Sequence, residues 1–310
     1  MTTRLVGKES RGMLTVTVIW ILAVLGMSAW VQGATVFYDG FTGAAGNLAG
    51  QTANIGGTWN SAVNVLDTAW KVETDGFTWP GLASSGGRVV AQIGGEANPI
   101  INSGNPNLQN LFSNAGTFYF TMLFRDDLSS PPTGQPPQVN ANGGHGGIEF
   151  KSAAGPGLVN PLEDNAGGSG TGPTLRMPEV HDAVSGEGRF TADSSDFGLH
   201  DNEVHLLAMQ IVNDGSTGAD EVNLVLDPIL AFGEPLWVFS PMRVTNFNIT
   251  DFLYDTVTLS GARLDPLIPF ASYDEIRVAT TWPEVIGIPE PSTLGLLFLG
   301  GLLALGTRRR

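Results

Sequence analysis

Carboxylates that share one strand are the first candidates for hydrolytic chemistry in this sequence. A glycosidase needs two of them across the scissile bond, roughly 5–9.5 Å apart, and the spacing Glu-x-Asp-x-x-Glu on one strand is one way to place them. No acid follows Glu221 at the required positions, and Arg277 stands where the middle acid should follow Glu275. A pair built from separate strands, with Glu149 as one member, stays open as an alternative. We therefore predict that the protein is not an enzyme.

Metal binding is the second kind of chemistry that the residue types allow. No two histidines have the i, i+4 spacing of a helical zinc pair or the His-x-His spacing of a strand pair. The histidines are His145, His181, His200 and His205. Asp126 and Asp127 follow a predicted strand, which makes them candidates for a structural calcium site, with a solvated pair of acids as the alternative. We expect no other cofactor.

Aromatic rings are the remaining route to a ligand, because sugar rings stack on exposed Trp and Tyr side chains. The tryptophans of the body are Trp59, Trp70, Trp79, Trp237 and Trp282. Trp79 precedes Pro80 and Trp237 follows Pro235, and both contexts resemble turns. We predict glycan stacking at Trp79 and Trp237; the alternative is that both rings fill the core.

The charge of the chain excludes one class of partner. Residues 1–33 and 292–310 hold six of the 15 basic residues and one of the 30 acids, so nine basic and 29 acidic residues remain in Ala34–Pro291, a net charge of −20. Only two of the nine are lysines, Lys71 and Lys151. Such a surface repels phosphate backbones, and we predict that the protein binds no nucleic acid.

The N-terminus predicts export. Arg4, Lys8 and Arg11 lead into an apolar stretch, Met13–Met27, which ends in small residues. This pattern is typical of a Sec-type signal peptide, so the Sec machinery is a predicted partner and the mature chain should begin at Ala34. An uncleaved signal anchor is the alternative. The chain has no cysteine, so the exported body must fold without disulfides.

The C-terminus predicts contact with the membrane. The triplet Pro289, Glu290 and Pro291 precedes an apolar run, Leu294–Leu305. About 15 residues there carry no charge, which is short beside the roughly 17–25 of a spanning helix. Three arginines follow, Arg308, Arg309 and Arg310, and basic flanks keep that end on the cytoplasmic side.

This layout resembles the PEP-CTERM sorting signal of bacterial exported proteins. In that family a Pro-Glu-Pro motif precedes a transmembrane helix and a basic tail, and an exosortase is believed to cut near the motif. The resemblance implies exosortase-type processing, inner-membrane anchoring before that processing, and a final place at the cell surface or in the extracellular matrix. An ordinary C-terminal anchor is the alternative.

The body between the two ends is predicted to be all-β. The 41 glycines and 19 prolines of the chain divide it into short runs, and in the body these runs are β-rich and have no helical periodicity. One run places Phe118, Phe120 and Met122 on a single face. The strand candidates are Thr35–Phe41, Ala69–Glu73, Arg88–Ile93, Thr117–Phe124, Gly147–Lys151, Val204–Val212, Glu221–Leu226, Tyr254–Leu259 and Glu275–Thr280. The Gly- and Pro-rich segments Asp127–Gly147 and Ser152–Thr174 are predicted to be loops.

Short motifs along the body resemble those of PEP-CTERM proteins with a concanavalin A-like, laminin-G-like jelly roll. They are Phe37–Phe41, Gly56–Trp59, Ser84–Val89, a central hairpin of Val204–Leu207 with Val222–Leu224, and a closing strand, Ser272–Val278, before Thr281 and Trp282. The resemblance implies an antiparallel β-sandwich. Most of these residues serve folding, because glycines form turns and aromatic residues fill the sandwich core.

Three segments and one leading function result. Residues 1–33 are predicted to be a signal peptide, residues 34–287 a concanavalin A-like β-sandwich, and residues 288–310 a sorting signal with a transmembrane helix and a basic tail. We predict an exported, non-catalytic module associated with glycan or exopolysaccharide. A structural surface protein without a small ligand is the alternative, and a divergent polysaccharide hydrolase is the third and least favoured.

Overall fold

The structure is a computed structural model of the chain. It describes residues 33–61, 70–91, 100–126, 145–152, 155–165, 174–176, 179–181, 203–215, 220–240, 242–247, 255–261 and 271–287. Thr35–Gly287 form one compact unit. Within the described ranges, no helix is long and apolar enough to cross a membrane. The predicted signal helix and C-terminal transmembrane helix lie outside these ranges.

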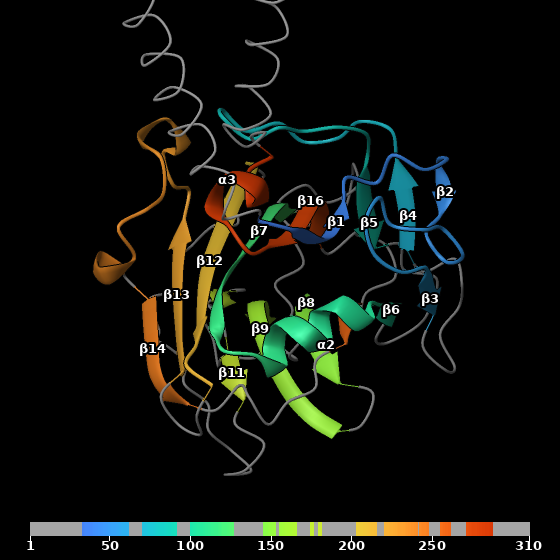
Figure 1. The fold of residues 1–310 in the computed structure, drawn as a ribbon. Coiled ribbons are helices and arrows are strands. Elements are labelled where there is room, and N and C mark those ends of the chain that lie inside the picture. Colours follow the sequence, from blue (N-terminus) through green and yellow to red (C-terminus); the bar gives the residue numbers. More distant parts are fainter. Residues whose placement is uncertain are drawn as a thin grey trace, which may run out of the picture. The chain divides into compact units, whose positions relative to one another are not determined.

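The larger of two antiparallel sheets has nine strands (Figure 1). Eight of them follow the order β14-β13-β12-β7-β16-β5-β4-β2, and β1 also pairs with β16. In chain order their bounds are β1 (Thr35–Asp39), β2 (Gly46–Asn47), β4 (Trp70–Glu73), β5 (Arg88–Ala91), β7 (Gly116–Asp126), β12 (His205–Asn213), β13 (Asp220–Leu226), β14 (Met242–Phe247) and β16 (Ala271–Ala279). The predicted hairpin is confirmed, since β12 pairs with β13 from Leu207 with Leu226 to Val212 with Glu221.

The second sheet has seven strands in the order β10-β9-β8-β15-β6-β3, with β11 also paired with β9. Their bounds are β3 (Trp59–Ser61), β6 (Ile100–Gly104), β8 (His145–Ser152), β9 (Gly155–Asn165), β10 (Thr174–Arg176), β11 (Glu179–His181) and β15 (Thr256–Gly261). Every strand pair in both sheets is antiparallel.

The two sheets enclose an aromatic core. Phe118 and Phe120 of β7 are buried on the face that alternation predicts. Phe150 of β8 meets them across the core, with its ring centroid 5.5 Å from that of Phe120. This face-to-face packing confirms the predicted antiparallel β-sandwich.

The outer face of the larger sheet is covered as well. Tyr119, Leu123 and Leu206 point away from the sandwich core and form a second apolar cluster. The covering elements are the 3-10 turns η2 (Leu230–Phe232) and η3 (Trp237–Phe239) and the short helix α3 (Trp282–Val285). Strand β12 is therefore buried along nearly all of its length.

Helix α2 (Pro106–Ser113) corrects the expectation that the body has no helix. The Asn105 side chain caps it by accepting a hydrogen bond from the Asn107 backbone nitrogen at 2.9 Å, and Pro106 opens the first turn. Leu108 and Phe112 stand four residues apart and are both buried. Two turns are too short to produce a readable helical period, although the Asn-Pro start signal was present.

All nine strand candidates coincide with strands of the structure, within a few residues at each end. The predicted loop Ser152–Thr174 is wrong, because β9 occupies about half of it and pairs with β8. The other predicted loop lies mostly outside the described residues, and its last residues, from His145 onward, belong to β8. Pairing with a neighbouring strand has overridden the local bias of Gly and Pro.

Removing the Phe150 ring tests the sandwich core. Phe150 contacts Phe112 of α2 as well as Phe120 of β7. We expect Phe150→Ala to lower the free energy of unfolding by about 3–5 kcal/mol in urea titrations of residues 34–287. The control is Phe232→Ala, because Phe232 is 86% exposed and should change stability by less than about 0.5 kcal/mol. A cost below about 1 kcal/mol for Phe150→Ala would contradict the packing.

Candidate functional site

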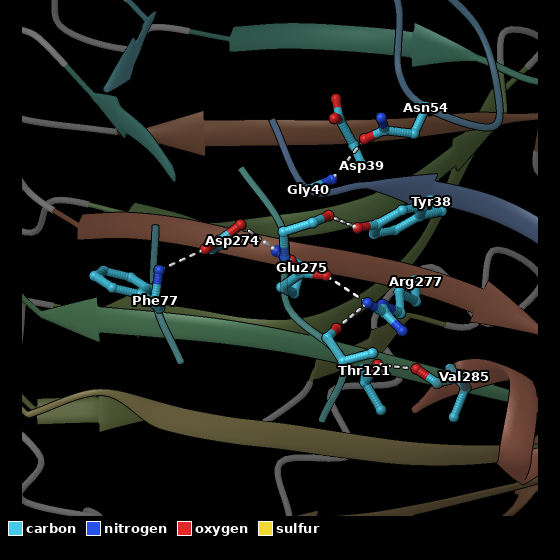
Figure 2. Close-up of polar contacts among 12 residues, drawn as sticks. Tyr38, Asp39, Gly40, Asn54, Phe77, Thr121, Asp274, Glu275, Arg277 and Val285 are labelled. Atoms are coloured by element: carbon cyan, nitrogen blue, oxygen red, sulfur yellow. Dashed lines mark hydrogen bonds and ion pairs between the residues drawn. The ribbon is translucent and has the colours of Figure 1, made fainter. Parts of the chain in front are cut away.

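A bulge in strand β16 gathers the buried charged residues of the larger sheet. The pairing register with β7 shifts between Asp274 and Arg277, and Glu275 has a φ of 51°, which non-glycine residues rarely adopt. Figure 2 shows the resulting group of side chains between β1, β16 and β7. A bulge re-aims side chains that a regular strand would alternate.

Glu275 and Arg277 form an ion pair inside this group. Glu275 is fully buried, and one of its carboxylate oxygens lies 2.6 Å from Arg277 Nη2. The other accepts a hydrogen bond from the Ser85 backbone nitrogen at 2.5 Å. Arg277 also donates to the Ala83 carbonyl and lies over the Tyr38 ring, 4.5 Å from its centroid. The pair therefore joins β16 to β1 and to the segment before β5.

Two further carboxyls are buried nearby, and both are engaged by fixed donors. Asp274 accepts from the backbone nitrogens of Phe77 at 2.6 Å and of Glu275 at 2.7 Å. Burial, and secondarily the charge of Glu275, raise the pKa of Asp274 to about 8. Asp39 accepts from Trp59 Nε1 at 2.6 Å, and burial raises the pKa of Asp39 to about 6. These carboxyls hold loops in place, and neither is among the residues that line the pocket beside Arg277.

Two neighbouring glycines allow the backbone to approach this group closely. A Cβ on Gly86, whose φ is 95°, would lie 2.4 Å from the Gly40 carbonyl oxygen, and one on Gly87 would lie 1.9 Å from the Glu73 carbonyl oxygen. No side chain fits at either position. This explains the Ser-Ser-Gly-Gly motif that the sequence shows before β5.

A pocket of about 290 Å³ opens beside the ion pair. Its lining residues are Thr35, Tyr38, Ile55, Ala83, Ser84, Ser85, Arg277, Glu284 and Gly287. The Tyr38 and Ser85 hydroxyls are hydrogen-bonded to each other at 2.5 Å, and Glu284 accepts from the Thr281 hydroxyl at 3.0 Å. The pocket thus offers hydroxyls, one carboxylate and part of an arginine, a set suited to a small polar ligand.

Hydrolysis by two carboxylates requires a pair of acids. Among the described residues that line the pocket, Glu284 is the one acid. Glu275, behind Arg277, has both oxygens engaged and is fully buried. The other glutamate considered from the sequence, Glu221 of β13, is paired with Arg243 at 2.7 Å, and this partner lowers the pKa of Glu221. Glu149 lies on β8 and faces Thr258 of β15 in the strand register.

The two tryptophans predicted to stack on sugars differ in exposure. The expected exposure of Trp237 is wrong, since it is 7% exposed, packs against Tyr119 and Trp282 and donates to Glu234 at 2.7 Å. Trp237 is buried because it covers the outer face of the larger sheet as part of the second cluster. The turn-like sequence around Trp237 did not reveal this packing. Trp79 is half-buried against the same cluster. A stacking role for Trp79 stays a prediction.

The structure describes Asp126, one of the two predicted calcium ligands. Asp126 ends β7, opposite Ala271 in the register, and Asp127 lies outside the described ranges. Within those ranges no group of three or more His, Asp or Glu side chains is placed to hold a metal ion. His205 lies 2.7 Å from Asp227, which also accepts from the Leu206 nitrogen. His145 lies on β8 and His181 on β11; His200 is outside the described part.

Reasoning from the sequence missed one signal for the pocket, the residue Arg277. Arg277 appeared only as a departure from a hydrolase motif, yet an arginine two residues after a glutamate in an apolar strand needs a partner when both are buried. Tyr38 and Ser85 line the pocket only because of the bulge in β16 and the pairing of the strands. No local sequence pattern predicts the bulge or the pairing.

Comparison with known protein families identifies the C-terminal segment of the chain. The described structure is an antiparallel β-sandwich, and residues 287–310 match the PEP-CTERM protein-sorting motif. The predicted sorting motif is therefore confirmed; Pro289, Glu290, Pro291 and the terminal arginines fall within the match, outside the described residues. The motif indicates an exported protein sorted to the cell surface and implies processing by an exosortase.

Solved structures give only distant likenesses. An endo-1,3-beta-glucanase from Streptomyces sioyaensis is 12% identical with a TM-score of 0.40, covering 80% of this chain and 96% of its own. The alginate lyase Aly36B is 10% identical with a TM-score of 0.43, covering 79% of this chain and 97% of its own. Peanut lectin with a bound peptide is 10% identical with a TM-score of 0.36, covering 81% of this chain and 98% of its own. At such TM-scores the likenesses assign neither fold family nor activity, so the concanavalin A-like family stays a prediction. No curated protein sequence matches the chain.

The raised pKa values of Asp39 and Asp274 predict a stability that falls as pH rises. Each carboxyl contributes stability that is fully present below its unfolded pKa near 3.8 and is lost as pH rises through about 6 for Asp39 and about 8 for Asp274. We expect the Tm of residues 34–287, measured by calorimetry, to fall by about 5 °C or more between pH 5 and pH 9.

In Asp274→Asn the side chain cannot titrate. We expect this variant to have a lower Tm at every pH and a smaller fall of the Tm above about pH 6. Ser84→Ala is the control, because Ser84 is exposed and has no titratable group, so the slope should stay unchanged. A Tm that stays constant or rises from pH 5 to pH 9 would show that the two buried acids do not titrate as described.

Proposed function

We propose that the protein is a non-catalytic cell-surface module that binds extracellular polysaccharide, with the pocket beside Arg277 holding one sugar unit. The observation that carries the proposal is the pairing of the Tyr38 and Ser85 hydroxyls at the rim of a pocket of about 290 Å³. That volume lies at the lower end of small-molecule sites and suits a single sugar ring. The sorting motif supports the proposal, because a protein sorted to the cell surface can meet extracellular polysaccharide there.

The rigidity of the pocket supports recognition without a conformational change. Arg277 is held by Glu275 and by the Ala83 carbonyl, and the Ser85 backbone is held by the same glutamate. Groups fixed before the ligand arrives lose little freedom on binding. A neutral glycan also avoids the repulsion that the acidic body would exert on an anionic one.

The state of the carboxylates supports binding over hydrolysis. A glycosidase needs one acid to protonate the leaving group and a second to act as base or nucleophile. The pocket presents Glu284 alone, and Glu275 is committed to Arg277 and Ser85. Calcium at Asp126 and Asp127 remains part of the proposal as a structural ion.

A polysaccharide array with residues 34–287 tests the proposal, with calcium or a chelator and with reducing ends assayed in the same wells. We expect binding to at least one neutral polysaccharide, competed by its oligosaccharides and without release of reducing ends. Silence across the array would favour a structural surface protein, and release of reducing ends would establish a hydrolase.

Filling the pocket should abolish that binding. Ser84 is exposed and lines the pocket, so Ser84→Trp adds a large side chain there without disturbing the core. We expect at least a tenfold loss of affinity at unchanged Tm. Ala45→Trp adds the same ring at an exposed position outside the pocket and should bind as the original protein does. Equal losses in both variants would refute the pocket.

A further inference from the structure

The segment between β13 and β14 concentrates the exposed apolar side chains of the structure. Within the described residues, six large hydrophobic side chains are exposed, and five of them lie here. They are Ile229 (66% exposed), Phe232 (86%), Leu236 (73%), Val238 (65%) and Phe239 (77%). We name residues 229–239 the apolar loop. An apolar surface of this kind on an otherwise acidic protein marks an interaction site.

Buried anchors hold the apolar loop in a fixed shape. Leu230 is 6% exposed and Trp237 is 7% exposed, and both belong to the second cluster. The turns η2 and η3 are closed by hydrogen bonds from the Gly233 nitrogen to the Leu230 carbonyl and from the Ser240 nitrogen to the Trp237 carbonyl. The outward side chains are therefore exposed because their neighbours are anchored, and no local rearrangement can bury them without losing those anchors.

The apolar loop lies beside the end of the folded unit. The ring centroids of Trp237 in η3 and Trp282 in α3 are 5.6 Å apart. The described unit ends at Gly287, five residues after Trp282. The apolar run of the sorting signal starts at Leu294, seven residue steps after Gly287, and seven extended steps span at most about 25 Å.

We propose that the apolar loop docks on the lipid bilayer, inserting its five exposed side chains into the interfacial region of the leaflet. The proposal rests on the predicted membrane insertion of Leu294–Leu305, which would bring α3, and with it the loop, within reach of the lipid. Phe, Leu and Ile side chains partition into that region.

The charges of the loop and the body specify the kind of membrane contact. Residues 228–240 contain one charged side chain, Glu234, whose carboxylate accepts the hydrogen bond of Trp237 Nε1. The loop has no basic residue to attract anionic headgroups, and the acidic body repels them. The contact is therefore hydrophobic, favours zwitterionic lipid and depends little on salt.

Flotation of residues 34–287 with phosphatidylcholine vesicles tests the proposal. The core clusters lie within this unit, so it retains the anchors of the loop. We expect vesicle binding that persists at 0.5 M NaCl, and at least a tenfold smaller partition coefficient for Phe232→Ser/Phe239→Ser at unchanged Tm. The control, Ala44→Ser/Ala45→Ser, changes two exposed apolar residues outside the loop and should bind as the original protein does.

Three results would overturn the membrane contact. They are absence of vesicle binding, equal binding by the loop variant and the original protein, and a dimer in sedimentation that the loop variant abolishes, which would assign the surface to a second copy of the chain. Polysaccharide binding distinguishes failure of the membrane contact from failure of the proposed function. The loop variant should still bind polysaccharide, whereas Ser84→Trp should not.

Discussion

The ion pair between Glu275 and Arg277 is the interaction on which this end of the sandwich depends. It sits in a bulge of β16, and each partner also reaches a second segment, Glu275 through the Ser85 nitrogen and Arg277 through the Ala83 carbonyl. A Cβ on Gly287 would lie 2.0 Å from Arg277 Nη1, so the residue that opens the sorting motif must be a glycine for the chain to pass this arginine. The Glu275–Arg277 pair therefore contacts the segment before β5, the pocket and the last residue of the folded unit.

Burial and fixed hydrogen-bond donors give two neighbouring acids, Asp274 and Asp39, a structural role. A raised pKa is often a sign of a catalytic acid, and Asp274 and Asp39 have raised pKa values. Their oxygens, however, accept from backbone nitrogens and from the Trp59 indole, and desolvation is the first cause of both shifts. Such groups fix loops around the pocket at the cost of stability at high pH, whereas a general acid must reach the substrate.

Much of the sandwich was readable from the sequence, because alternation and aromatic residues mark half-buried strands such as β7. Strand β9 was missed because pairing with β8 outweighs its glycines and prolines, and α2 because two turns leave too short a pattern. Trp237 was misjudged because its buried position depends on an outer face of the sheet that only the topology creates. The pocket could not be predicted for a similar reason. Arg277 lies over the Tyr38 ring because of the bulge at Glu275, which has a positive φ, and the residue types do not predict that conformation.

A double-mutant cycle on Glu275 and Arg277 tests the central claim most directly, with urea unfolding of residues 34–287 as the measurement. Removing one partner of a buried pair leaves an uncompensated charge or an unpaired polar group. Glu275→Gln and Arg277→Met should each lower the free energy of unfolding by about 3–5 kcal/mol, and the double variant should lose clearly less than the sum of the two. Single losses below about 1 kcal/mol that simply add would contradict the claim that this pair organises the site.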